Sequence, residues 1–114
     1  NKNMAIDADR GLIKQAIVNI EHNAIRYSRE NAFIEIKLGD NSLSIKNYGE
    51  SIPKESLEKI FEAFYCVDKS RAKKFGGSGL GLAIAKEILD RHKFRISANS
   101  VDGDFVEFII DFKG

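Results

Sequence analysis

The stretch that decides the fold runs from Arg10 to Arg26 and reads RGLIKQAIVNIEHNAIR. Apolar residues recur in it with the i, i+3, i+4, i+7 spacing of one helix face. They are Ile13, Ala16, Ile17, Ile20 and Ala24. Asp9 stands directly before this stretch, at the position of a helix N-cap. The pattern predicts an amphipathic helix with one face on a hydrophobic core.

Strand and helix patterns continue on the C-terminal side of this helix. Residues 33–38 and 43–47 alternate around a turn at 39–41 and predict a hairpin, and residues 94–98 and 105–112 predict a second pair of strands. Residues 53–64 predict a short helix with Pro53 in its first turn, residues 80–89 an apolar helix, and residues 5–8 an edge strand. This order predicts an α+β fold, a two-layer α/β sandwich in which three helices cover one face of a mixed, mostly antiparallel sheet.

Composition limits the classes of protein that the chain can represent. Its 114 residues fit one domain, 43% of them are hydrophobic, and 31% are charged, which argues against a disordered tail. Lys and Arg number 18 against 17 Asp and Glu, so general electrostatic binding to nucleic acid is not expected. The single cysteine, Cys66, cannot form an internal disulfide, which fits a reducing compartment. No apolar run approaches the length of about 20 residues that a helix needs to cross a bilayer.

Polar side chains of the first helix form one candidate site. Asn19, Asn23 and Arg26 are spaced by four and three residues and therefore share a helix stripe. Carboxamide oxygens can bind a hard cation such as Mg²⁺, and an adjacent arginine can bind phosphate. A solvated polar face would give the same pattern.

A glycine-rich run forms a second candidate site. Residues 76–86 read GGSGLGLAIAK and lead directly into the predicted apolar helix. Glycines allow a ligand to approach the backbone closely, and the free N–H groups of a helix N-terminus attract anions. The spacing matches neither a Rossmann fingerprint nor a P-loop. A flexible hinge would also explain such a run.

Taken together and in this order, the two motifs resemble the N box and the G2 box of the ATP-binding domain of sensor histidine kinases. That domain belongs to a superfamily shared with gyrase, mismatch-repair ATPases and a chaperone. Residues 60–65 (IFEAFY) are similar to the F box, and residues 67–71 (VDKSR) to the start of the lid that follows it. The resemblance implies the Bergerat-type ATP-binding fold, with ATP and Mg²⁺ as cofactors and residues 67–78 as a mobile lid.

The resemblance also implies a role for each matching residue. Asn19, Asn23 and Arg71 would form the catalytic set, with Asn23 as the Mg²⁺ ligand and Arg71 as a lid arginine that reaches the phosphates. Tyr27 would pack on adenine, on the core, or on both. The residues expected to bind the nucleotide are Asn19, Asn23, Arg26, Tyr27, Asn47, Gly49, Ile52, Gly77, Ser78, Gly79, Leu80 and Gly81.

Three segments depart from the family pattern. Asn47 stands where the family has an aspartate that accepts a hydrogen bond from adenine, so a charge-assisted bond becomes a neutral one. Ser51 replaces a glycine of the same motif. Residues 92–94 read HKF where His-Gly-Gly is usual, and residues 103–105 are a degenerate G3 box. The last two departures are expected to affect the C-terminal hairpin more than the chemistry.

The expected reaction is phosphoryl transfer. Superfamily ATPases have a glutamate four residues before the Mg²⁺ asparagine, and this chain has Asn19 there, which is no base. Glu21 projects roughly 200° away from Asn23 on the helix. The resemblance implies that the acceptor is a histidine on a separate dimerisation domain, because neither His22 nor His92 has the sequence context of an acceptor.

The chain is therefore expected to be one domain, residues 1–114, cut from a longer protein and lacking the domain that carries the acceptor histidine. The resemblance implies a homodimeric parent that signals to a response regulator, a monomeric fragment, and a cytoplasmic location; membrane anchoring of the parent is left open. Two alternatives remain: a non-catalytic nucleotide-binding pseudokinase, and a protein-serine kinase of the anti-sigma type. The F box and the lid entry favour the histidine kinase over the latter.

Overall fold

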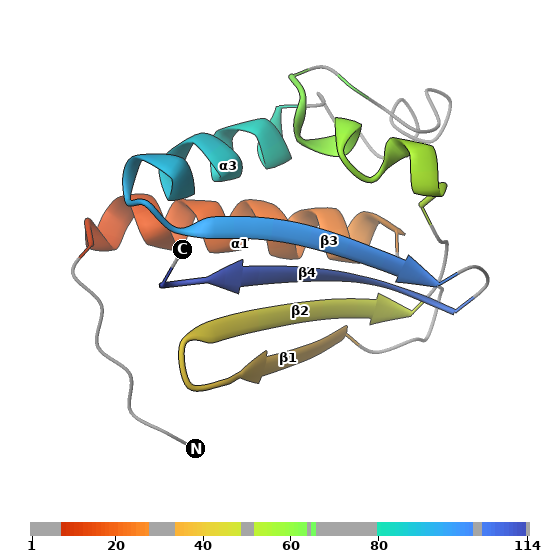
Figure 1. Ribbon diagram of the computed structural model, residues 1–114, viewed down its shortest axis with the longest axis horizontal. Helices are drawn as coiled ribbons and strands as arrows, with labels where there is room; N and C mark the ends of the chain where they lie inside the picture. Colours follow the sequence, from red (N-terminus) through yellow and green to blue (C-terminus); the bar gives the residue numbers. More distant parts are fainter. Residues whose placement is uncertain are drawn as a thin grey trace.

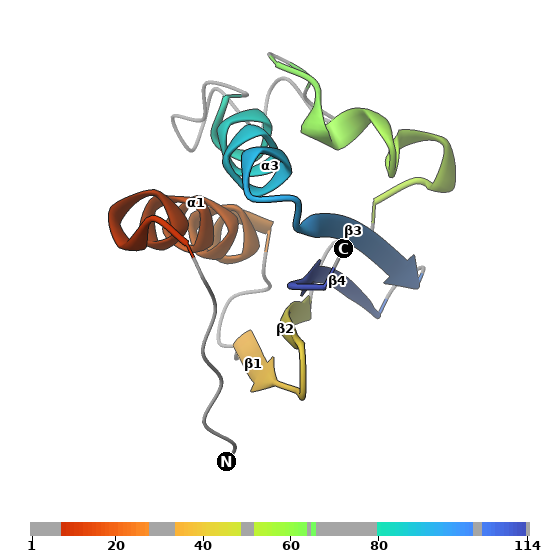
Figure 2. The same cartoon turned by 60° about the vertical axis from the view of Figure 1, so that its left-hand side comes forward.

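The computed structural model describes residues 8–27, 34–48, 52–63, 65, 80–101 and 104–113. These residues form two layers, with two α-helices lying on one face of a four-stranded sheet (Figure 1). Figure 2, turned by 60°, shows both helices on the same side of the sheet. No helix in these ranges is both long enough and apolar enough to cross a bilayer. The predicted two-layer sandwich is confirmed.

The first helix, α1, spans Arg10–Tyr27, one residue more than predicted. Asp9 caps it, because the Leu12 N–H donates to the Asp9 Oδ1 at 3.0 Å. The apolar stripe faces inward, and Ile13, Ala16, Ile20 and Ala24 are buried. The helical period of the sequence therefore fixed both the element and its buried face.

The sheet consists of β1 (Ile34–Leu38), β2 (Ser42–Tyr48), β3 (Arg95–Val101) and β4 (Phe105–Asp111), in the order β1-β2-β4-β3. Both predicted strand pairs are present, and every pairing between these described strands is antiparallel. The mixed character predicted for the sheet is not seen within them. Strand β4 occupies the interior between β2 and β3, although it comes last in the chain.

The register of the sheet divides its side chains between two faces. Ile36, Ile45, Phe108 and Ala98 pair across the four strands and face the helices. Ile45, Val106, Phe108 and Ile110 are each about 1% exposed and form the centre of the core with Ile20 and Leu89 of the helices. The core is thus closed by the two central strands, β2 and β4.

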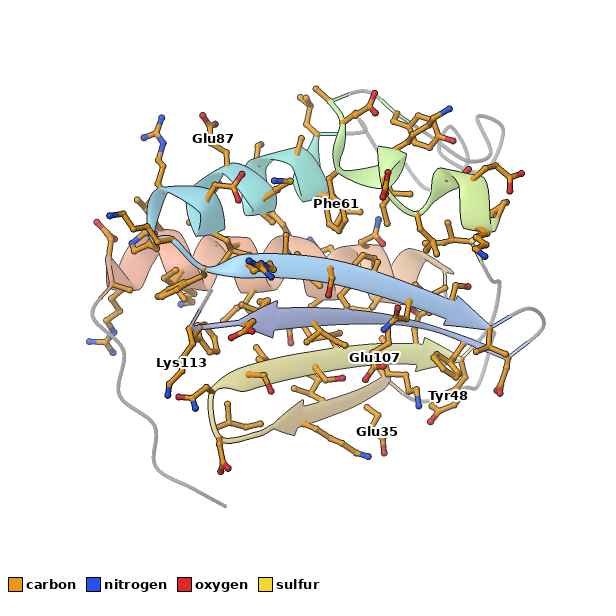
Figure 3. All side chains as sticks on the ribbon, viewed as in Figure 1. Glu35, Tyr48, Phe61, Glu87, Glu107 and Lys113 are labelled. Atoms are coloured by element: carbon orange, nitrogen blue, oxygen red, sulfur yellow. The ribbon has the colours of Figure 1, made fainter. Side chains whose placement is uncertain are left out.

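Polar side chains on the opposite face of the sheet contact one another (Figure 3). The Tyr48 hydroxyl donates to the Glu35 Oε1 at 3.3 Å, and the Ser44 hydroxyl donates to Glu107. The Lys46 Nζ lies 4.0 Å from the ring centre of Phe105. This face does not carry the residues predicted to form the site.

The second described helix, α3, spans Gly81–Arg91 and ends in a tight hydrogen-bonded turn. The Phe94 N–H donates to the Leu89 carbonyl at 2.9 Å and the Lys93 N–H to the Asp90 carbonyl at 3.0 Å. Lys93 has a φ of 62°, which is the left-handed region. This is a Schellman motif with a lysine at the position that glycine usually occupies.

The prediction of one short helix over residues 53–64 is wrong. The chain forms two 3₁₀ turns there, η1 (Lys54–Ser56) and η2 (Lys59–Phe61), so the described residues contain two α-helices and not three. Leu57 and Ile60 pack on the core at a spacing of three, which a 3₁₀ turn aligns on one side. Phe61 meets Phe108 edge to face, with ring centres 6.3 Å apart. Packing on the core therefore outweighs helix propensity.

Two predicted features cannot be compared with the structure. Residues 5–7 of the predicted edge strand lie outside the described residues. Ala8 is the first described residue, and it forms a bend. Residues 67–78, predicted to be the lid, also lie outside them.

Candidate nucleotide-binding site

Asn47 is the most unusual polar side chain in the described part of the chain. It lies on β2, opposite Ile34 and Val106, and shares the helix-facing side with Ile45. It is 1% exposed, and within the described ranges neither its Oδ1 nor its Nδ2 has a hydrogen-bond partner. Leaving such a group unpaired in a core costs about 1–3 kcal/mol. A ligand that supplies both a donor and an acceptor would recover this free energy.

The chemistry of the Asn47 carboxamide fits the edge of adenine. Its oxygen can accept from an amino group while its amide nitrogen donates to a ring nitrogen, as asparagine does with adenine in nucleic acids. The ionised aspartate of the family pattern can accept hydrogen bonds but has no donor. Asn47 therefore has the donor and acceptor that an adenine ligand requires.

Asn19 joins helix α1 to the start of α3. Its Nδ2 donates to the Gly81 carbonyl at 3.2 Å, across 62 residues of sequence. Asn23 lies one helical turn further along the same stripe and is partly exposed. The structure thus brings together residues from both motifs that the sequence singled out.

Gly81 is the first residue of α3, and Leu80 stands at its N-cap position. The Leu80 carbonyl accepts the Ile84 N–H at 2.9 Å, which closes the first helical turn. A Cβ added at Gly81 would lie 3.9 Å from the Asn19 Cβ, an ordinary contact. Packing within the described protein therefore does not require glycine at this position. A ligand close to the helix N-terminus would require it.

Ile52 lies four residues after the end of β2 in the sequence and is buried in the core at 8% exposure. Its N–H donates to the Ser100 hydroxyl at 2.9 Å, and that hydroxyl donates to the Phe105 carbonyl at 3.2 Å. Ser100 thus links the Ile52 backbone to β3 and β4. Sequence reasoning missed this residue, because no local pattern connects positions 52 and 100.

Several predicted site residues are not described in full. Arg26 and Tyr27 form the end of α1, but their side chains lie outside the description. Gly49, Arg71, Gly77, Ser78 and Gly79 also lie outside the described residues, as does Ser51. Their roles stay predictions.

Glu21 and His22, which precede Asn23 on α1, do not belong to this candidate site. Glu21 lines a groove along α1 together with Lys14 and Val18, and neither Asn19 nor Asn23 lines it. His22 is exposed on the helix surface. No carboxylate of this helix is therefore placed to replace the glutamate of the hydrolytic relatives.

The described residues contain no cluster of three or more His, Cys, Asp and Glu side chains that could enclose a metal ion. Mg²⁺ bound to a nucleotide needs no such cluster, because phosphate and water oxygens supply most of its ligands. One carboxamide oxygen, as in Asn23, matches this coordination chemistry. The residues present therefore fit a phosphate-bound Mg²⁺.

The helical stripe, the glycine at the start of α3 and the buried Asn47 define an ATP-binding domain of the two-layer class. The family model described as "Histidine kinase-, DNA gyrase B-, and HSP90-like ATPase" matches residues 8–114, and the chain belongs to this family.

The chain is similar to sensor kinases of bacteria. It is 39% identical over 109 residues to the sensor histidine kinase WalK of Bacillus subtilis, an alignment that covers 90% of this chain and 18% of that protein. It is 41% identical over 115 residues to a sensor protein kinase WalK of Staphylococcus aureus, with 96% and 28% covered. The chain therefore spans less than a third of the length of these curated relatives.

Solved structures agree with this assignment. The catalytic domain of histidine kinase ThkA, in a nucleotide-free form, matches with a TM-score of 0.79 and 36% identity over 96% of this chain and 72% of that one. Full-length ShkA, in complex with AMPPNP, matches with a TM-score of 0.73 and 25% identity over 92% of this chain and 22% of that one. The fold and the family are thereby established.

Proposed function

We propose that this domain binds Mg-ATP and donates the γ-phosphoryl group to a histidine on a separate dimerisation domain, as one step of two-component signalling. The proposal extends from the family to the reaction and its partners. The observation that carries it is the buried carboxamide of Asn47, which has no hydrogen-bond partner among the described residues. Such a group favours a ligand that presents a donor beside an acceptor, as adenine does.

The phosphate end of the site would be formed by both helices. Asn23 would hold Mg²⁺, which supplies neutralisation of phosphate charge when it is bound. The first N–H groups of α3, at Gly81, would bind phosphate oxygens. Arg26, Arg71 and the glycines at 77 and 79 are proposed to complete the phosphate site, and Tyr27, Gly49, Ile52, Ser78 and Leu80 to enclose the nucleotide.

The side chain at position 19 supports transfer over hydrolysis. A hydrolase of this superfamily needs a carboxylate there to activate water, and Asn19 is neutral. Its amide nitrogen donates to the Gly81 carbonyl, so the side chain connects α1 to the start of α3. Water would be activated poorly at this site, which leaves the γ-phosphoryl group for another nucleophile.

The partners are proposed on the same basis. The relatives are named sensor kinases, and this chain spans 18% of the Bacillus subtilis protein. We infer that the acceptor histidine lies in another part of a homodimeric, cytoplasmic parent region, and that a response regulator receives the phosphoryl group. The likeness to kinases favours this reading over a pseudokinase and over a serine kinase of the anti-sigma type.

The test uses the chain together with the helical acceptor region of its own parent protein, purified separately. With γ-labelled ATP and Mg²⁺, we expect acid-labile, base-stable label on the acceptor region. Replacing the acceptor histidine with alanine should remove this label, and so should Asn23→Ala in the present chain.

Three results would contradict the proposal in different ways. Release of free phosphate as the main product would indicate a hydrolase. Acid-stable label would indicate a serine kinase. ATP binding without any transfer would indicate a pseudokinase.

A further inference from the structure

Helix α1 begins near the end of α3 (Figure 1), and the side chain of His92 joins the two ends. The Asp9 N–H donates to the His92 Nε2 at 3.0 Å, across 83 residues of sequence. The His92 Nδ1 lies 2.8 Å from the Ile88 carbonyl, which can only accept. The ring is therefore neutral, with its proton on Nδ1, and both nitrogens are engaged.

His92 accepts a hydrogen bond from the Asp9 N–H, which has no acceptor within α1. Asp9 caps the helix through its side chain, which accepts from the Leu12 N–H. In a capping box the third residue of the helix is Glu or Gln and accepts from the N–H of the capping residue. Here that third residue is Leu12, which has no acceptor. His92 takes this role from another helix.

The neighbourhood of His92 fixes its ring in place. The ring stacks on Phe94 with centres 5.7 Å apart, and Phe94 meets Phe112 edge to face at 5.1 Å. The Phe94 backbone is itself held by the Leu89 carbonyl at the end of α3. His92 is therefore a rigid acceptor and not a mobile surface residue.

Helices α1 and α3 are thus joined by hydrogen bonds at two separate places. Asn19 binds Gly81 at the start of α3, and Asp9 binds His92 directly after its end. Two hydrogen bonds at separate points along the helix pair oppose sliding of one helix along the other. Asn23 of α1 and the first turn of α3 then keep a constant relative position, whereas Asn47 belongs to the sheet.

We infer that His92 is a positioning residue for the phosphate end of the site. It acts through α1, by holding the register of Asn23 against the N-terminus of α3, and it contacts no nucleotide. The inference rests on the proposed function. It assigns to His92 an effect on the triphosphate that is separate from any effect on the base.

Two substitutions separate the two hydrogen bonds of His92. In His92→Asn the side-chain amide reaches the position of Nδ1 and keeps the bond to the Ile88 carbonyl. In His92→Gln the longer side chain reaches the position of Nε2 and keeps the acceptor for the Asp9 N–H. A role in ending α3 is preserved by asparagine, and a role in positioning α1 is preserved by glutamine.

The experiment measures binding of ATP and of adenosine, each with Mg²⁺, and amide exchange at Asp9 by NMR. A small displacement of binding groups can lower affinity by a large factor. We therefore expect His92→Asn to weaken the binding of ATP about tenfold and that of adenosine less than about twofold. The Asp9 amide should also lose its protection from exchange. His92→Gln should retain Asp9 protection and bind ATP within about threefold of the original chain.

The outcomes separate this inference from the proposed function. If the unsubstituted chain binds no ATP, the proposed function fails. If it binds ATP and His92→Asn binds ATP equally well, only the positioning role fails. Equal weakening of ATP and adenosine, or no rescue by glutamine, also overturns that role and leaves His92 as a residue of the fold alone.

Discussion

At the scale of single residues, Asn47 pairs a destabilising environment with a proposed binding role. Asn47→Leu keeps the branching and the number of side-chain heavy atoms and removes the unpaired polar atoms, so the domain without ligand should become more stable by about 1–2 kcal/mol. ATP binding should weaken at least about tenfold, because the proposed base contacts are lost. Urea unfolding and calorimetric titration measure the two effects.

The control for Asn47 is Ile45→Val on the same strand and the same face. Removing one methyl group from this buried side chain should lower stability by about 0.5–1.5 kcal/mol and leave ATP affinity unchanged. Loss of stability in Asn47→Leu would mean that the carboxamide has a partner in the protein, and unchanged ATP affinity would exclude it as the base reader.

Gly81 offers a second test at this scale. A methyl group there meets only an ordinary contact with Asn19, so Gly81→Ala should not lower the unfolding free energy. It would crowd a phosphate at the helix N-terminus, and we expect ATP to bind about tenfold more weakly. Gly11→Ala, in the first turn of α1, is the matched control, because its Cβ also has room and it is remote from the site. Equal ATP affinities for both variants would exclude close approach of the ligand at Gly81.

At the scale of elements, the end of α3 has a local strain that a single substitution can relieve. Lys93 adopts a φ of 62°, and a left-handed conformation is unfavourable for a residue with a Cβ. Lys93→Gly should raise the unfolding free energy by about 0.5–1 kcal/mol, which urea unfolding can resolve. Lys93→Ala retains the Cβ and should bring no such gain. A less stable glycine variant would show that the lysine side chain contributes more than the strain removes.

The same scale shows which parts of the structure were predictable. The 3.6-residue period from Ile13 to Ala24 and the alternation in both strand pairs gave α1 and all four described strands, because burial on one face dictates these patterns. The turns at 54–61 were not predictable, since three apolar residues fit either helix type. The resemblance to a His-Gly-Gly segment did give one signal, because it puts a glycine where Lys93 now has a positive φ.

The candidate site was predictable in part for a related reason. The motifs identified Asn19 and Gly81, and the structure joins them by a hydrogen bond. The contact between Asp9 and His92 leaves no local signal, because its partners are 83 residues apart and neither belongs to a repeating pattern. Long-range hydrogen bonds of this kind depend on the packed fold.

At the scale of the whole molecule, ligand binding should appear as added stability. A ligand at 100 times its dissociation constant stabilises the native state by about 2.7 kcal/mol. We therefore expect ATP with Mg²⁺ to raise the thermal midpoint clearly more than ATP with EDTA. Asn23→Ala should reduce the difference between these two conditions. An equal rise with and without Mg²⁺ in the unsubstituted chain would contradict a metal role for Asn23.

The place of β4 inside the sheet also governs how the domain can form during synthesis. Residues 105–111 lie between β2 and β3, which have no hydrogen-bonded contact with each other. Among the described strands, until residue 111 has left the ribosome β3 lacks the strand it pairs with, β2 pairs with β1 alone, and the core lacks Val106, Phe108 and Ile110. We expect a nascent chain stalled before residue 105 to be digested readily by protease, so that this domain folds only once translation has passed its last strand.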